Sequence, residues 1–296
     1  MDLLARVVIL MGLSAGLASA TVLDGAPLDA TPAIRQYLDH SKFAWSCERS
    51  EHFQFCFEAK SLAAQNIRDL KIIAEDNRNA ILELVGVPDY DPLIYAFFVN
   101  SRSQMKRLIG AKVDGRARPN QHATFYVING PRTLAHEISH EILSNLWGAA
   151  EPWIEEGFAV YATESPILDD DCRAYVKAHR LLPLDQIVNS KWDSSMYSAD
   201  ITYTELGGFV KFLERTYGLA RIAQVWQQGA LSIPQVYGKS VAALEQEWLA
   251  ALAHPPAERS NCTVVTGEPV PCPGTGTSTI ATPPVLISRP HRSSWK

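Results

Sequence analysis

The sequence predicts an α+β protein whose first half mixes strands with helices and whose second half is mainly helical. In the first half we expect strands near residues 52–58 and 93–99, with a long helix from about Leu62 to Leu84 between them. Beyond Glu156 the pattern is mainly helical. The expected helices there are Cys172 to Arg180, Tyr203 to Tyr217, Ala220 to Gln227 and Val241 to Ala253.

The middle of the chain predicts a strand, a turn and a helix in succession. Residues 123–128 are rich in aromatic and β-branched side chains, which is typical of a strand. Residues 129–133, Asn-Gly-Pro-Arg-Thr, suit a turn that starts a helix, because Pro is tolerated in a first turn and Asn or Thr can cap exposed amides. The helix then gains an apolar side from residues spaced four apart, namely Leu134, Ile138, Ile142 and Leu146.

This predicted helix carries His136, Glu137 and His140 in an HExxH pattern. Residues four apart lie about 40° apart around a helix, so both imidazoles share one face and can bind one metal ion. An HExxH helix binds zinc in metalloproteases and uses the glutamate as general base. The alternative is an accidental pattern on a polar helix face, with Glu137 an exposed first-turn residue favoured by the helix dipole.

A further ligand is expected from a second helix. A catalytic zinc usually takes three protein ligands and leaves a fourth position for water. Gly148 suits the end of the first helix, and Pro152 suits the start of the next. Residues 154–164 can form that second helix, which carries Glu155 and Glu156. Either carboxylate lies on the element that must fold back over the histidines.

Two motifs together resemble a known family. HEISH at 136–140, followed by WIEEGFAVY at 153–161, is similar to the gluzincins, the thermolysin-like and aminopeptidase-like branch of zinc metallopeptidases. In that family the Glu directly before Gly is the third ligand, whereas Asn commonly stands at the position of Glu155 in the aminopeptidases. The resemblance implies one Zn²⁺ held by His136, His140 and Glu156, with Glu137 as the base.

The resemblance continues downstream. The segment Tyr203–Leu213 is similar to a helix of peptidase-MA-like gluzincin domains, and residues 237–248 resemble the last helix of those domains. In gluzincin aminopeptidases a Tyr in a Y-x-x-G segment donates to the oxyanion, and Tyr203 matches it by position. The alternatives are a core-facing Tyr203, with Tyr197 as a weaker candidate for the donor.

The family also implies an arrangement of the chain. It implies a zincin-like fold of two lobes, an α/β N-terminal lobe with the HExxH helix and a mainly helical C-terminal lobe, with the cleft between them. In zincins the strand beside the active-site helix is an edge strand to which extended substrate adds. Residues 123–128 are therefore either that edge strand or an ordinary strand of the sheet.

The ends of the chain differ in composition from its middle. Residues 1–20 suit a secretory signal peptide, because the apolar run is short and Ala18-Ser19-Ala20 resembles a cleavage site; an uncleaved anchor is the alternative. We expect an N-terminal extension at 21–45, the metallopeptidase-like domain at 46–253 and a flexible tail rich in Pro, Gly, Ser and Thr at 254–296. The signal predicts a secreted or periplasmic protein.

The five cysteines fit export to an oxidising compartment. Cys47 and Cys56 flank a predicted hairpin, and Cys262 and Cys272 bracket a short loop of the tail, so both spacings suit local disulfides. Cys172 is then odd, either buried or open to another molecule. Pairing of Cys172 with Cys262 is an alternative.

The net charge and the lack of further long apolar stretches limit the classes of partner that we expect. A net charge of −5 gives no basic footprint for nucleic acid, and no later stretch predicts stable membrane insertion after signal cleavage. We therefore expect a peptide or protein substrate. No clear G-x-M-E-N motif for a free amino terminus is present, which modestly favours an endopeptidase over an aminopeptidase. The alternative is a non-catalytic secreted binding protein that retains a zincin fold.

Overall fold

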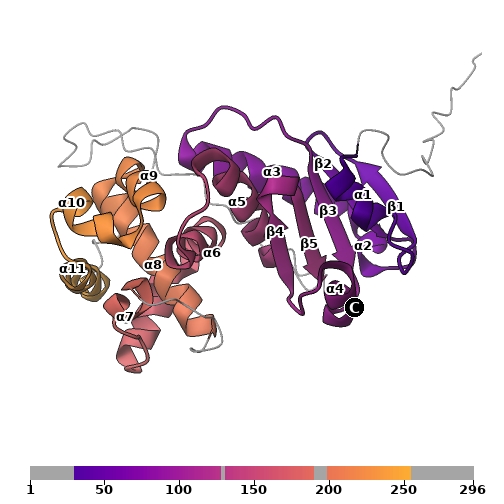
Figure 1. Ribbon diagram of the computed structural model, residues 1–296. Helices are drawn as coiled ribbons and strands as arrows, with labels where there is room; N and C mark the ends of the chain where they lie inside the picture. Colours follow the sequence, from indigo (N-terminus) through magenta and orange to yellow (C-terminus); the bar gives the residue numbers. More distant parts are fainter. Residues whose placement is uncertain (1–29, 128–130, 190–198, 255–296) are drawn as a thin grey trace, which may run out of the picture.

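The computed structural model describes residues 30–127, 131–189 and 199–254 (Figure 1). The predicted signal peptide, most of the predicted tail, Tyr197, Cys262 and Cys272 lie outside these ranges. Within them, no helix has the length and apolar character needed to cross a membrane. The described residues form an α+β fold, as predicted, built on one mixed sheet.

The sheet has five strands in the order β1-β2-β3-β5-β4. Neighbours β2, β3 and β5 run parallel, while β1 and β4 pair antiparallel at the two edges. Strands β2 and β3 are buried on both faces, and β3 is a continuous hydrophobic run, as expected for a strand covered on both sides. The strand bounds are β1 Trp45–Arg49, β2 Phe53–Glu58, β3 Ile94–Val99, β4 Gly115–Arg118 and β5 Ala123–Val127.

Helices cover both faces of this sheet. One face packs into the main hydrophobic core together with α3 (Ile67–Val85) and α5 (Pro131–Trp147). A smaller apolar cluster joins the other face to α1 (Pro32–Leu38) and α4 (Arg102–Ile109). Helix α5, which carries the HExxH motif, therefore packs on the same face of the sheet as α3.

The long helix expected from Leu62 to Leu84 is divided. A short helix α2 (Leu62–Gln65) ends at Asn66, and α3 begins at Ile67. The backbone of Asn66 is not helical, with φ −117° and ψ 14°, which separates the two segments.

Of the two interpretations of the strand predicted at 123–128, the ordinary sheet strand is the one that the described residues Ala123–Val127 support. Strand β5 lies between β3 and β4, so both of its sides are paired. The edge beside α5 belongs instead to β4, a Gly-Arg-Ala-Arg segment with no β-branched residue. The open edge of the sheet beside α5 is therefore β4.

The second part of the chain is helical, as expected. Figure 1 shows α7 to α11 on one side, the sheet on the other, and α5 and α6 between them. The bounds are α6 Pro152–Lys177, α7 Leu184–Asn189, α8 Ala199–Tyr217, α9 Leu219–Gln228, α10 Ile233–Tyr237 and α11 Val241–Ala253.

The expected break between residues 164 and 172 is wrong, because α6 runs unbroken through 26 residues. The acidic run Asp169-Asp170-Asp171 lies inside this helix. Leu168 and Cys172, four residues apart, are both fully buried against α8, and this packing keeps the segment helical. The two helices approach closely here, since a Cβ atom on Gly208 would lie 2.5 Å from the Cys172 sulfur.

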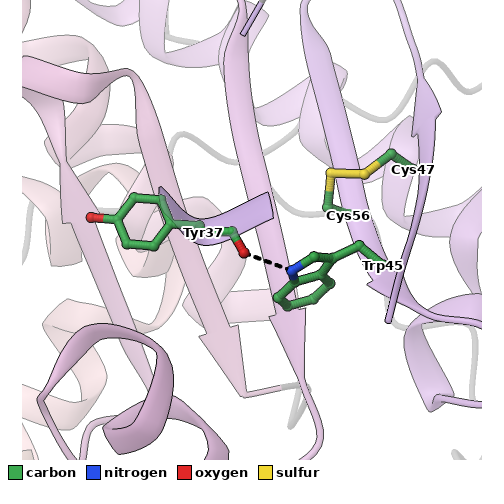
Figure 2. Close-up of a disulfide and its surroundings, with 4 residues drawn as sticks. All are labelled: Tyr37, Trp45, Cys47 and Cys56. Carbon is green, nitrogen blue, oxygen red and sulfur yellow. Dashed lines mark hydrogen bonds between the residues drawn. A yellow bond between two sulfur atoms is a disulfide. The ribbon is translucent and has the colours of Figure 1, made fainter. Parts of the chain in front are cut away.

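The predicted disulfide between Cys47 and Cys56 is confirmed (Figure 2). The two residues face each other across the antiparallel pair of β1 and β2. Beside them, the indole N–H of Trp45 donates to the carbonyl of Tyr37 at 2.8 Å, which ties α1 to the sheet. Cys172 is free and buried.

Candidate metal centre

The HExxH helix α5 places its apolar and polar residues as the sequence predicts. Leu134, Ile138 and Ile142 are buried in the main core. The opposite side carries His136 and His140, whose rings meet edge to face with centroids 4.7 Å apart. The core therefore fixes the rotation of the helix, and this rotation turns both imidazoles toward α6.

Helix α6 supplies the third donor. The Oε2 atom of Glu156 lies 3.0 Å from Nε2 of His136 and 3.4 Å from Nε2 of His140, and the two Nε2 atoms are 3.1 Å apart. These three residues form a group that could hold a metal ion.

The spacing of the donor atoms suits a tetrahedral ion. Metal–nitrogen and metal–oxygen bonds of about 2.0–2.1 Å at tetrahedral angles put the donors about 3.3 Å apart. The observed separations of 3.0 to 3.4 Å among His136, His140 and Glu156 match this value. Two neutral imidazoles and one carboxylate are also a donor set that divalent metals of this geometry take.

The three donors lie close enough together to shift one another's pKa values. Burial would raise the pKa of Glu156, but hydrogen bonds and charge from His136 and His140 lower it well below its ordinary value. Burial would likewise lower the pKa of His140, yet Glu156, Glu137 and Glu155 together raise it to about 9. A metal ion replaces the proton that these partners otherwise stabilise on the imidazole.

The neighbouring Glu155 has a different position. Its Oε1 atom accepts a hydrogen bond from the hydroxyl of Ser144 at 2.8 Å and lies 4.0 Å from Nδ1 of His140. Nδ1 is the ring nitrogen of His140 on the far side from Nε2, which belongs to the donor group. The structure therefore groups Glu156, and not Glu155, with the two histidines.

Glu137 lies beside the donor group at the wall of a cavity of about 890 Å³. Its side chain is buried, with 7% of its surface exposed, and burial raises the pKa of its carboxyl group. It packs against the edge strand, since a Cβ atom at Gly115 would lie 2.8 Å from Cδ of Glu137. The Glu137 carboxylate can occupy this position because residue 115 is a glycine and has no side chain.

Tyr203 also reaches the centre, from α8. Its ring lies edge to face with His136, with centroids 6.1 Å apart, and it lines the same cavity. Burial and the charges of Glu156 and Glu137 raise the pKa of its hydroxyl, so the group remains a proton donor at neutral pH. The structure thus brings Tyr203 to the cavity, whereas Tyr197 lies outside the described residues.

No protein-family model matches the chain, and no curated protein is significantly similar to it.

The cavity extends well beyond the metal group along one face of α6. Its wall on that helix includes Glu156, Val160, Thr163, Asp171 and Tyr175, which recur at helical spacing. Asp171 follows Glu156 by fifteen residues, or about 22 Å at 1.5 Å per residue. The cavity is therefore an elongated groove, and the metal group occupies only part of it.

Sequence reasoning missed the opposite wall, which is formed by β4 and its flanks. Gly115, Arg116 and Ala117 line the cavity there. The segment has little β propensity, and its place at the edge follows from its pairing with β5. One signal in the sequence could have indicated this edge strand. Residues 115–118 are close in sequence to the strand at 123–127, and Pro119 lies in the turn between them.

A second buried carboxylate lies on α5 directly after His140. The Oε1 atom of Glu141 accepts hydrogen bonds from the Tyr90 hydroxyl at 3.1 Å and the Asn145 amide at 3.0 Å, and lies 3.0 Å from Nδ1 of His122. Burial raises the pKa of Glu141 to about 7 despite these partners. The group ties the loop before β5 to the HExxH helix and so supports the helix from behind.

Proposed function

We propose that this chain is an exported zinc-dependent peptidase of the gluzincin type, with a two-lobed zincin arrangement and an endopeptidase mode of action. The observation that carries the proposal is the convergence of four groups on one groove. His136, His140 and Glu156 form a metal-sized donor set, and Glu137 lies beside it.

The residues divide the chemistry of amide hydrolysis among them. When bound, Zn²⁺ supplies a Lewis acid at this position, which lowers the pKa of water and polarises a carbonyl. Glu137, whose pKa is raised by burial, accepts a proton from the attacking water and passes it to the leaving amine. The Tyr203 hydroxyl donates a hydrogen bond to the oxygen that gains negative charge.

The edge strand supplies main-chain partners for a peptide. The N–H of Val127 donates to the carbonyl of Asp114 at 2.7 Å, so this pair is hydrogen-bonded in the ladder between β4 and β5. Hydrogen-bonded and non-hydrogen-bonded pairs alternate in an antiparallel ladder. The N–H and C=O groups of Gly115 and Ala117 therefore face the open edge, where an extended peptide can pair with them.

The length of the groove favours internal cleavage. The wall formed by α6 extends about 22 Å from Glu156 to Asp171, which accommodates about six or seven residues of extended peptide at about 3.3 Å each. Room for several residues of extended chain beside the metal group suits an endopeptidase. The disulfide between Cys47 and Cys56 supports an oxidising compartment and hence export.

The proposal is tested by digestion of a defined mixture of peptides, followed by mass spectrometry of the products. We expect cleavage at internal bonds, complete loss of cleavage after chelation, and recovery when Zn²⁺ is restored. Removal of terminal residues alone would indicate an exopeptidase. Zinc binding with no cleavage of any peptide would favour the non-catalytic binding protein, and a protein that takes up no metal would overturn the proposal.

A further inference from the structure

The charged side chains of the edge strand and its entry share one side. Side chains alternate along a strand, and position 115 faces Glu137 of α5, so Asp114, Arg116 and Arg118 face the other way. Two of the three are committed to partners. Asp114 pairs with the guanidinium of Arg102, whose Nε donates at 2.6 Å.

Arg118 is committed as well. Its guanidinium donates to the hydroxyl of Tyr37 and, at 3.0 Å, to the carbonyl of Ile109. The same group lies over the aromatic rings of Tyr37 and Phe125, at 5.5 and 5.7 Å from their centroids. Arg118 therefore serves the packing of α1 on the sheet.

Arg116 lies between these two residues without a partner of its own. Within the described ranges its guanidinium makes no hydrogen bond or ion pair, and the side chain is exposed. It nevertheless lines the groove of the metal group. Its positive charge is close enough to lower the pKa of both Glu137 and Tyr203, against the upward effect of burial.

We propose that Arg116 selects an acidic residue, Asp or Glu, at one position of the bound peptide. This inference rests on the proposed function, because it takes the peptide as a strand added to the open edge of β4. If the peptide adds antiparallel to β4, Gly115 and Ala117 offer it their backbone groups. Arg116 then occupies a non-hydrogen-bonded position relative to the peptide, between these two residues. Side chains at such a position lie especially close to the residue directly opposite, and opposite charges there attract.

The charges around the groove limit this preference to one position. Arg116 is the single Lys or Arg side chain among the described residues that line the groove. Outside the metal group, the other side chains of the wall that can carry a charge are acidic, namely Asp114, Glu137, Glu155 and Asp171. An acidic substrate residue is therefore favoured opposite Arg116 and disfavoured elsewhere along the groove.

The test compares cleavage maps and peptide binding for the full chain and its variants. Arg116→Gln removes the charge, Arg116→Glu reverses it, and Lys112→Gln removes a nearby exposed charge that does not line the groove. Binding is measured in a Glu137→Gln background by fluorescence anisotropy. The probes are three labelled ten-residue peptides that differ in one central residue, Glu, Gln or Lys.

We expect the Zn²⁺-loaded protein to favour Asp or Glu at one fixed position from the cleaved bond, by about two- to fivefold at low ionic strength. Arg116→Gln should abolish this preference, Arg116→Glu should reverse it toward Lys, and Lys112→Gln should leave it unchanged. Added 0.5 M salt should weaken it.

Two other outcomes overturn the inference in distinguishable ways. Cleavage without a positional acidic preference, or with a preference that survives Arg116→Glu, overturns the role of Arg116 and leaves the peptidase intact. Failure to cleave or bind any peptide overturns both. Binding of the Glu peptide that depends on Arg116, without cleavage, supports the role of Arg116 and removes the peptidase.

Discussion

The carboxylate of Glu137 lies where a side chain at position 115 would stand. A Cβ atom on Gly115 would be 2.8 Å from Cδ of Glu137 and 2.7 Å from Cγ2 of Thr133, both well inside van der Waals contact. The edge strand and the HExxH helix thus meet through a glycine and a glutamate. This contact places the proposed base at the wall of the groove.

Gly115→Ala should therefore displace Glu137 and lower peptide hydrolysis by about 100-fold, because misplacement of a catalytic group by about 1 Å costs that much. The metal donors lie on other residues, so zinc stoichiometry should not change. Steady-state kinetics and metal analysis of the same preparation provide the measurement.

A double-mutant cycle isolates the cause. Gly115→Ala should destabilise the wild-type protein more than it destabilises a Glu137→Ala protein, in which the space is already open. Equal destabilisation in both backgrounds would show that the contact between residues 115 and 137 does not matter.

The positions of the two adjacent glutamates predict different effects on metal affinity. Glu156→Gln should weaken zinc binding more than about 100-fold, because a donor atom is replaced. Glu155→Gln should weaken it about tenfold or less, because Glu155 lies near the far ring nitrogen of His140. Competition with a fluorescent chelator measures both affinities. The reverse order would make Glu155 the ligand.

Much of this centre is predictable from local sequence, and the reason is geometric. The spacing of His136 and His140 fixes their common face once a helix forms, and the four-residue spacing of the apolar residues on α5 fixes which way that face turns. The position of Glu156 depended on one further step, the return of the chain after Gly148. Helix periodicity and a short turn bring Glu155 and Glu156 toward the histidines, but the choice of Glu156 came from the resemblance to the gluzincins.

The wall of the groove formed by β4 could not be predicted from local sequence. Whether Gly115 and Arg116 lie at the edge of the sheet depends on strand order, which is set by contacts between distant segments. Helix α6 shows the same limit: Asp169 to Asp171 suggest a break, yet Leu168 and Cys172 pack against α8 and hold the helix together. Tertiary packing decided both cases.

The disulfide offers a test of which parts of the molecule the site needs. Replacing both Cys47 and Cys56 with Ser should lower the free energy of unfolding by about 2–3 kcal/mol, as expected for a short closed loop. Because β1 and β4 lie at opposite edges of the sheet, zinc affinity and hydrolysis should persist below the unfolding transition. Urea unfolding followed by circular dichroism measures the first effect. Loss of metal binding in the folded variant would contradict the separation of the two edges.

Glu205 predicts a dependence of stability on pH. This fully buried carboxyl group accepts a hydrogen bond from the backbone N–H of Leu182 at 3.2 Å, and burial raises its pKa to about 8. Between its ordinary value of 4.5 and about 8, the folded protein binds a proton that the unfolded chain releases. Stability should therefore fall as the pH rises through this window, by on the order of a few kcal/mol.

Glu205→Gln removes the titration but keeps an acceptor for the Leu182 amide. The variant should lose stability less steeply than the wild-type protein between pH 5 and pH 8, while Glu83→Gln, an exposed control, should follow the wild type. Chemical unfolding at a series of pH values provides the comparison. Parallel curves for Glu205→Gln and the wild-type protein would show that Glu205 does not titrate in this range.

The central claim is that Glu137 acts on substrate beside a metal held by other residues. The most direct measurement compares wild-type and Glu137→Gln proteins for bound zinc, by elemental analysis, and for turnover of a peptide cleaved by the wild type. We predict one zinc per chain in both proteins and a rate about 10²- to 10⁴-fold lower in the variant. Full turnover by Glu137→Gln, or turnover that chelation leaves unchanged, would contradict the account.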